Sequence, residues 1–265
     1  MATVHPNSIV DPSAQLADGV EIGPFCTVGA GVRIAAGTRL VSHVVIDGDT
    51  EIGQGNTFYP FCSIGLASQD KKYAGEPTRT VIGDNNVFRE SCTVHRGTVQ
   101  DEGVTRIGSR GLFMAYAHVA HDCVIGDDVI LANAATLGGH VRVGHWAILG
   151  GLAGVHQFCR IGEHAMVGGA SCVLQDVAPY TLGQGNPFGV SSVNAEGLKR
   201  RGFSIDAIAA VRHAYKVVFR NNLTLREAIA ELQTQVSDPA VAGDVRAALQ
   251  PLLDFLQTPG RGLAR

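Results

Sequence analysis

Histidine, whose side chain titrates nearest to neutral pH, is concentrated in one part of this chain. Six of the ten histidines lie between residues 118 and 164: His118, His121, His140, His145, His156 and His164. His121 is followed directly by Asp122 in the string AHVAHDC. A histidine whose tautomer is fixed by a carboxylate can act as a general base, a role that accelerates reactions by about 10²–10⁴-fold. The pattern therefore indicates a His121–Asp122 pair, although adjacency in sequence leaves the contact between the two side chains open.

The same histidines allow a second interpretation, a metal centre. His140 and His145, five residues apart, could join His118 or His121 around Zn²⁺ or another transition ion. A single histidine on an otherwise apolar repeat is most often structural, and we expect this for His145 and His164. The residues alone leave the general base and the metal centre as alternatives.

The elements that must position these histidines follow from a strict six-residue period. Apolar residues recur at every sixth position from Val4 to Ile64, at Ile82, Phe88 and Val94, and from Ile107 to Val173. A period of six fits neither an amphipathic helix nor an ordinary strand, and it indicates a repeat architecture in which short units share one core. Three units per turn predict a triangular parallel β-helix, whose handedness the period does not decide.

The cysteines follow the same register. Five of the six, Cys26, Cys62, Cys92, Cys123 and Cys159, occupy the slim position four residues after an apolar anchor, which points inward; only Cys172 does not. We expect the five to be small buried hydrophobic residues rather than redox or metal-binding groups. A disulfide framework is not expected in a long cytosolic chain.

The repeat is interrupted twice and then ends. Residues 66–80 and 97–106 are polar and predict two loops that leave the prism, and long loops on a rigid scaffold often carry function. We expect a β-helix over residues 1–190 and a helical domain over 191–265. Within that domain we predict a helix capped by Ser204, a second capped by Thr224 and Glu227, and a third that begins at Asp238 and Pro239.

Charge differs between these two parts. The formal net charge is −6 over residues 1–195 and +3 over residues 196–265. Basic residues of the second part gather at Lys199, Arg200, Arg201, Arg212, Lys216 and Arg220, which favours a phosphate or an acidic partner. An acidic chain with few aromatic residues argues against nucleic acid as the partner. No apolar run is long enough to span a bilayer and no signal segment is present, so we expect a soluble cytoplasmic protein.

Six strings in order carry a resemblance to a known family: DKKYAGEPTR (70–79), VHRGTVQ (94–100), AHVAHDC (117–123), GGHV (138–141), VHQFCRIG (155–162) and NAEGLKRRGF (194–203). They resemble the UDP-N-acetylglucosamine acyltransferases of lipid A synthesis over essentially the whole chain. The resemblance implies a homotrimer of left-handed parallel β-helices with active sites between subunits. It also implies transfer of a 3-hydroxyacyl group from acyl carrier protein to the 3-hydroxyl of the sugar nucleotide, without a cofactor or a catalytic metal.

By motif match, the resemblance makes His121 the general base, Asp122 its orienting partner and Gly139 the backbone N–H donor to the oxyanion. Substrate-binding roles fall on Gln69, Asp70, Lys72, His118, His140, His156, Gln157, Asn194, Glu196, Arg200 and Arg201. Gly169 matches the position that limits acyl-chain length, and a glycine there predicts a long chain.

Three alternatives stay open. A related N-acyltransferase of the same pathway carries an extra N-terminal uridine-binding domain, for which hexads starting at Val4 leave no room. A β-helical carbonic anhydrase holds a metal with three histidines across a trimer interface. A non-catalytic binding solenoid is disfavoured by the polar loops and by the clustered histidines.

Overall fold

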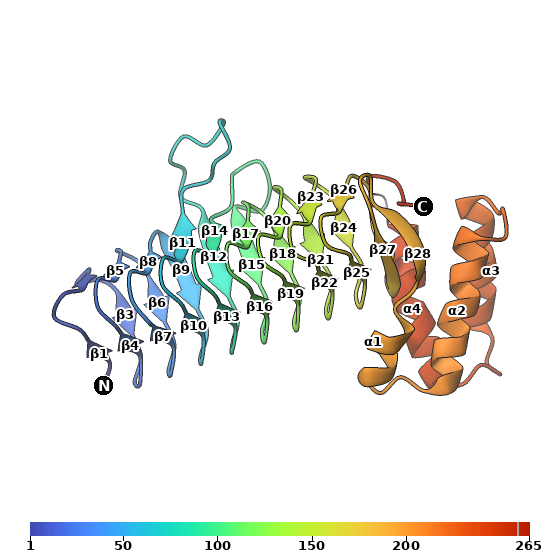
Figure 1. Ribbon diagram of the computed structural model, residues 1–265, viewed down its shortest axis with the longest axis horizontal. Helices are drawn as coiled ribbons and strands as arrows, with labels where there is room; N and C mark the ends of the chain where they lie inside the picture. Colours follow the sequence, from blue (N-terminus) through green and yellow to red (C-terminus); the bar gives the residue numbers. More distant parts are fainter. Residues whose placement is uncertain (259) are drawn as a thin grey trace.

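Each six-residue unit forms a strand of about two residues and a turn, and three units complete one coil. The computed structural model describes residues 1–258 and 260–265, and it stacks the coils into a three-sided prism that is followed by helices (Figure 1). Strands of successive coils pair in parallel and 18 residues apart, as His118 does with Thr136. The predicted parallel β-helix is confirmed, and it is left-handed.

The strands form three sheets, one on each side of the prism. Sheet A contains β1 (Thr3–Val4), β4 (Glu21–Ile22), β7 (Arg39–Leu40), β10 (Thr57–Phe58), β13 (Val87–Phe88), β16 (Leu112–Phe113), β19 (Ile130–Leu131), β22 (Ile148–Leu149), β25 (Met166–Val167), β27 (Thr181–Gln184) and the antiparallel β28 (Gly189–Val193). Sheet B contains β2 (Ile9–Val10), β5 (Thr27–Val28), β8 (Val45–Ile46), β11 (Ser63–Leu66), β14 (Thr93–His95), β17 (His118–Val119), β20 (Thr136–Leu137), β23 (Gly154–Val155) and β26 (Cys172–Val173). Sheet C contains β3 (Gln15–Leu16), β6 (Arg33–Ile34), β9 (Asp49–Ile52), β12 (Arg79–Ile82), β15 (Val104–Ile107), β18 (Val124–Ile125), β21 (Arg142–Val143) and β24 (Arg160–Ile161).

The interior of the prism is a continuous apolar column. Anchor residues of neighbouring coils stack on each other, and the rings of Phe58, Phe88 and Phe113 lie parallel with centroids 4.8 and 4.5 Å apart. The five cysteines predicted to point inward are buried and unpaired, and Cys172 is half-buried. Burial raises the pKa of Cys123 to about 12 and that of Cys159 to about 11. Cys123 and Cys159 are therefore protonated core residues and not nucleophiles.

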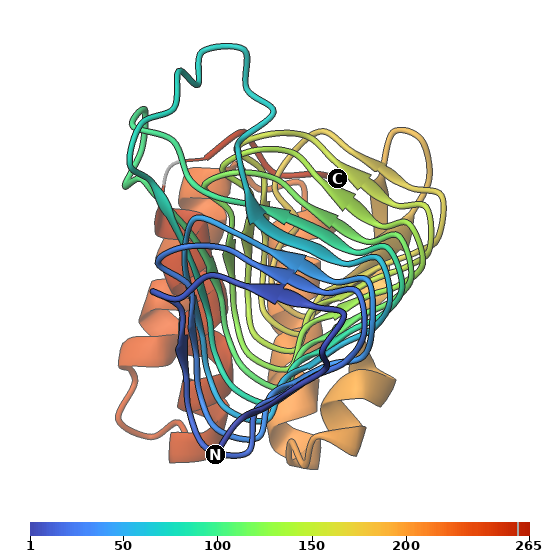
Figure 2. The ribbon, with the colours of Figure 1, turned by 90° about the vertical axis from the view of Figure 1, so that its left-hand side faces the viewer.

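Both polar loops leave the prism at one corner. The first connects β11 of sheet B to β12 of sheet C, and the second connects β14 to β15, again from sheet B to sheet C. They project side by side in the view along the prism (Figure 2). Both are shorter than the sequence predicts, because residues 79–81 of β12 pair with residues 104–106 of β15 across sheet C. The loops proper span residues 67–78 and 96–103.

Four helices cover the C-terminal end of the prism: α1 (Ala195–Arg200), α2 (Ile205–Phe219), α3 (Leu225–Ser237) and α4 (Gly243–Gln257). They bury a second apolar core of their own. The Ser204 cap and the Thr224–Glu227 capping box form as predicted. None of the helices in the described residues is long and apolar enough to span a membrane.

The prediction that the last helix begins at Asp238 and Pro239 is wrong. Asp238 ends α3, and its carboxylate accepts the backbone N–H of Ala240 at 2.8 Å. This local bond stabilises a turn, so the next helix starts only at Gly243.

His164 lies in an aromatic stack where the prism meets these helices. Its ring is parallel to Trp146 and near-parallel to Tyr180, and an N–H of Arg201 lies 3.3 Å from its Nδ1. Burial, together with the nearby Arg201 charge, lowers the pKa of His164 from 6.5 to about 4. The neutral ring is therefore a structural component of the junction, which agrees with the expected structural role.

We predict that His164→Phe makes the protein less sensitive to acid. The unfolded chain binds a proton at His164 below about pH 6.5, whereas the folded chain resists it until about pH 4, so stability falls as pH drops through this window. At pH 5 the loss amounts to about 2 kcal/mol. Thermal melting at pH 7 and pH 5 measures it: the variant should lose less stability than the parent. The exposed His213→Gln is the matched control, and an unchanged pH dependence in His164→Phe would contradict the prediction.

Candidate active site

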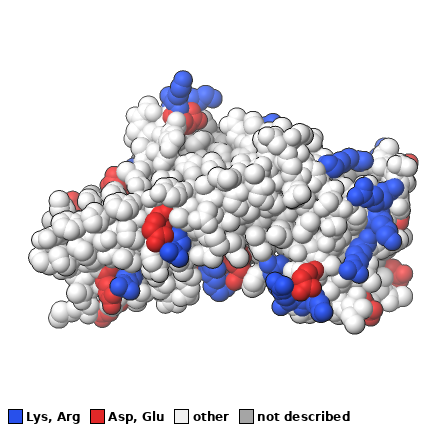
Figure 3. Space-filling model, in the orientation of Figure 1, with Lys and Arg blue, Asp and Glu red and all other residues white. Residues whose placement is uncertain are grey.

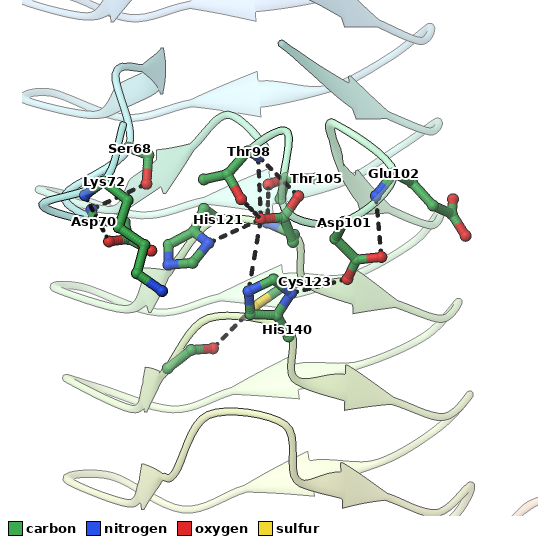
Figure 4. Close-up of polar contacts among 12 residues, drawn as sticks. Ser68, Asp70, Lys72, Thr98, Asp101, Glu102, Thr105, His121, Cys123 and His140 are labelled. Carbon is green, nitrogen blue, oxygen red and sulfur yellow. Dashed lines mark hydrogen bonds and ion pairs between the residues drawn. The ribbon is translucent and has the colours of Figure 1, made fainter. Parts of the chain in front are cut away.

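The residues of the expected catalytic pair lie at the corner between sheets B and C, one coil beyond the second loop (Figure 4). The turn from β17 to β18 places Asp122 in the left-handed region with φ of 58°. Its backbone N–H donates to Thr105 Oγ1 at 2.8 Å. The turn therefore directs the Asp122 side chain beneath the second loop, where it is 1% exposed.

The second loop supplies hydrogen bonds to this buried carboxylate. The Thr98 hydroxyl donates to Asp122 Oδ2 at 2.6 Å, and the Thr98 backbone N–H lies 2.8 and 3.1 Å from the two carboxylate oxygens. Burial alone would raise the pKa of Asp122, but hydrogen bonds from His121 and Thr98 outweigh it and the pKa is lowered. Asp122 is therefore a carboxylate at neutral pH.

His121 makes the side-chain contact that its sequence position left open. Its Nδ1 lies 2.9 Å from Asp122 Oδ2, and its side chain is 12% exposed. Because Asp122 is ionised, Nδ1 carries the proton that is donated to it. The lone pair of the neutral imidazole is then on Nε2, where a general base needs it.

Gly139, one coil further along, lies against the His121 ring. A Cβ atom at this position would collide with the imidazole carbon and nitrogen atoms of His121. The N–H groups on either side donate to backbone carbonyls, that of Gly138 to Val155 and that of His140 to His121. Within the described part of the chain, the Gly139 N–H has no such acceptor. A free backbone donor beside the general base is what an oxyanion site requires.

His140 completes the corner. Its ring is perpendicular to that of His121 with centroids 5.0 Å apart, and it stacks on Phe158 at 4.4 Å. His140 Nε2 lies 3.9 Å from Asp122 Oδ2, so His121, Asp122 and His140 offer a possible set of metal ligands. His145, which the metal hypothesis paired with His140, instead accepts the backbone N–H of Asp127. Within one chain, His145 and His140 therefore do not share a metal site, because His145 lies at the next corner, between sheets C and A.

The other residues expected in the prism occur on the same side. His118 lies on β17, where its Nδ1 is 2.7 Å from Thr93 Oγ1, and burial lowers its pKa. His156 and Gln157 follow β23 and are exposed. In the first loop, Gln69 and Lys72 are exposed and Asp70 is half-buried. Asp70 accepts the backbone N–H of Lys72 and orders this part of the loop.

The expected residues of the tail lie elsewhere. Asn194 is buried and caps α1, and its amide donates to the His164 carbonyl. Glu196 pairs with Arg200 at 3.1 Å. Arg201 lies over the Trp146 ring, at the corner between sheets C and A. One chain therefore brings the loop residues and histidines to one corner, and Arg201 to another.

Three polar residues of this corner were not predicted from the sequence. Thr98 and Asp101 belong to the second loop and contact Asp122 and His140, 24 and 39 residues away. His95 is buried beside His118, and burial lowers its pKa to about 4. The polar character of residues 97–106 was the only signal for the first two, because no repeat pattern links them to their partners.

Comparisons with known proteins identify the family and agree with the fold. A family model described as Udp N-acetylglucosamine O-acyltransferase, Domain 2, matches residues 176–264, and one described as Bacterial transferase hexapeptide (six repeats) matches residues 1–36. The chain is 52% identical to the acyl-[acyl-carrier-protein]–UDP-N-acetylglucosamine O-acyltransferase of Thiobacillus denitrificans over 265 residues, all of both chains. The protein of the same name from Herminiimonas arsenicoxydans is 48% identical, again over all of both chains. The solved UDP-N-acetylglucosamine O-acyltransferase of Moraxella catarrhalis superposes with a TM-score of 0.95 at 48% identity, over 99% of each chain.

A left-handed prism of hexapeptide coils, with a histidine–carboxylate pair at one corner and a helical cap, defines an acyltransferase of the hexapeptide-repeat class. Within that class the full-length identities decide the assignment. The chain belongs to the UDP-N-acetylglucosamine O-acyltransferase family.

Proposed function

We propose that this protein transfers a 3-hydroxyacyl group from acyl carrier protein to the 3-hydroxyl of UDP-N-acetylglucosamine, the first step of lipid A synthesis. The observation that carries the proposal is the His121–Asp122 pair, 2.9 Å apart and packed against Gly139. The names of the full-length relatives supply the donor and the acceptor.

In the proposed reaction, His121 Nε2 takes the proton of the sugar 3-hydroxyl while the hydroxyl oxygen attacks the thioester carbonyl. Asp122 stabilises the resulting imidazolium through Nδ1, and the Gly139 N–H donates to the oxyanion. When the tetrahedral intermediate collapses, the thiolate of the carrier leaves and takes the proton back from His121. The products are the ester and the free carrier thiol.

We propose that the first loop and the histidines His118, His140 and His156 hold the sugar nucleotide. Asp70 and Lys72 lie on the His121 side of the first loop (Figure 4), and Lys72 provides a cation for the diphosphate. Gln69 precedes Asp70 in the same loop and is exposed. Gln157 follows His156 in the chain and is exposed like it, so we assign it to the same binding surface.

The nucleotide-binding roles of Asn194, Glu196, Arg200 and Arg201 fit an assembly better than a single chain. Arg201 lies at a different corner of the prism from His121. A homotrimer in which neighbouring prisms face each other could bring the two corners together. We therefore propose a trimer with sites between subunits, in the cytoplasm where acyl carrier protein is found. Lys and Arg side chains gather on the helical end, which suits an acidic carrier protein (Figure 3).

The test is a transfer assay with UDP-N-acetylglucosamine and 3-hydroxyacyl carrier proteins of several chain lengths. Formation of the 3-O-acyl sugar nucleotide with release of the carrier thiol supports the proposal. Absence of product with every donor would overturn it. Transfer to an amino-sugar acceptor instead would favour the related N-acyltransferase.

Acyl-chain length is expected to depend on Gly169. This glycine is exposed, and a Cβ there would lie 3.2 Å from the Gly151 carbonyl. We predict that Gly169→Met shifts the preference from a chain of about fourteen carbons to a shorter one, because each excluded methylene forfeits about 0.8 kcal/mol of burial. Competition between long and short donors measures the ratio, with Gly169→Ala expected to lie between the parent and the Met variant. Equal selectivity in all three proteins would contradict the assignment.

A further inference from the structure

Two residues of the second loop form side-chain hydrogen bonds at the catalytic corner. Only one of them bonds to the His121–Asp122 pair. Thr98, near the start of the loop, donates to Asp122. Three residues later, Asp101 Oδ2 lies 2.8 Å from His140 Nδ1. The Asp101 side chain is 34% exposed and that of His140 is 10% exposed. A carboxylate from a surface loop therefore reaches a histidine that is nearly enclosed.

The Asp101 carboxylate is itself held in place. Its second oxygen, Oδ1, accepts the backbone N–H of Glu102 at 3.0 Å, and the Asp101 backbone N–H donates to the Thr98 carbonyl at 3.3 Å. Because Oδ1 is occupied, Oδ2 is directed at the imidazole. The loop thus presents one oriented acceptor to His140 Nδ1.

The remaining contacts of His140 fix the plane of its ring but not its tautomer. The ring stacks on Phe158, and its edge meets His121. Stacking is nearly unchanged when an imidazole turns over by 180° about the bond to its Cβ, whereas a bond to a carboxylate requires N–H at the facing nitrogen. With Nδ1–H directed at Asp101, Nε2 faces inward, 3.9 Å from Asp122 Oδ2.

We propose that Asp101 is a positioning residue, which holds His140 as the Nδ1–H tautomer and so leaves Nε2 unprotonated as a hydrogen-bond acceptor for the sugar nucleotide. This inference rests on the proposed function, because it takes His140 to contact that substrate. Asp101 acts only through His140 and touches no reacting atom. The loop then aligns both histidines of the corner, His121 through Thr98 and Asp122, and His140 through Asp101.

Kinetics of Asp101→Ala test the proposal. We expect KM for the sugar nucleotide to rise about ten-fold while kcat changes less than three-fold, the size of effect that a lost orienting partner has on a histidine. Asp101→Asn should fall in between, because one amide oxygen can serve either His140 or the Glu102 N–H but not both. Glu102→Ala is the matched control on the same loop, since its side chain is 63% exposed, and it should behave as the parent.

A double-mutant cycle separates positioning from a general loosening of the loop. In a His140→Ala background, Asp101→Ala should have no further effect on KM, because its partner is gone. Full, additive losses in the double variant would overturn the proposal. So would an Asp101→Ala protein with parental KM.

A measurement that does not depend on turnover tests the role of Asp101 separately from the proposed reaction. Nitrogen NMR of ¹⁵N-histidine-labelled protein, with the His140→Ala variant used to assign the signal, reports which ring nitrogen of His140 carries the proton. The parent should give the Nδ1–H pattern, and Asp101→Ala should give the Nε2–H pattern or a mixture. If the parent transfers no acyl group, the proposed function fails while this signal still decides the role of Asp101. An unchanged tautomer in Asp101→Ala would refute it.

Discussion

His121→Ala should reduce kcat for acyl transfer by about 10²–10⁴-fold. The reason is that the buried Asp122 carboxylate orients this ring through Nδ1, which leaves Nε2 as the base, and the ring lies against Gly139, whose N–H is the proposed oxyanion donor. Measurement of kcat and KM with saturating carrier protein distinguishes this loss from weaker binding. A loss confined to KM would make His121 a binding residue.

The matched control is His213→Ala. His213 lies on α2 with its side chain 57% exposed, so its removal should leave kcat unchanged. Asp122→Asn should fall between the parent and His121→Ala. The amide keeps the shape of the carboxylate, but it loses the charge that stabilises the imidazolium. A His121→Ala protein that melts like the parent and transfers at near-parental rate would exclude His121 as the base.

The prism was predictable because its register is repeated in every coil. One exception among the apolar positions does not change the six-residue period. Side chains four residues after each apolar position must point inward wherever the repeat holds. This is why the five cysteines were predicted as core residues and are buried. Handedness was not predictable from the period, because six residues per side fit either hand.

The limits of the loops and helices were harder to predict, for two different reasons. Residues 104–106 look like the end of a polar loop, yet they pair with the distant strand β12 as strand β15. Asp238 and Pro239 resemble a helix start, but a local bond from the Ala240 N–H to the Asp238 side chain forms a turn there. The first limit depends on a distant segment, and the second on a choice between two local hydrogen-bond patterns.

The candidate site also combines residues that are adjacent in sequence with residues that only folding brings together. His121 and Asp122 stand in one string, so the pair could be found by inspection. Thr98 and Asp101 act on residues 24 and 39 positions away, and only the folded corner brings them together. The resemblance assigned roles to residues that match a family motif. It assigned no role to Thr98 and Asp101 of the second loop, which contact Asp122 and His140.

Gly139→Ala should lower kcat by about 10²–10³-fold, the effect of losing one oxyanion donor. The added methyl group would occupy the space of the His121 imidazole, so the ring must turn away from Asp122. A displacement of about 1 Å is enough for such a loss. Steady-state kinetics give kcat, and thermal melting shows whether the protein stays folded. Gly154→Ala is the control, because a Cβ at that neighbouring strand position meets no atom within 4 Å.

The two effects of this substitution can be separated in a His121→Ala background. With the imidazole removed, the methyl group has no ring to displace, so any further loss reports the backbone donor alone. If Gly139 serves only to leave room for the ring, Gly139→Ala should be silent in that background. If its N–H also holds the oxyanion, residual transfer should fall again, because a shifted backbone misdirects the donor. Parental kcat in Gly139→Ala alone would contradict both roles of Gly139. A displaced His121 ring should slow proton transfer, and a displaced N–H should weaken binding of the oxyanion.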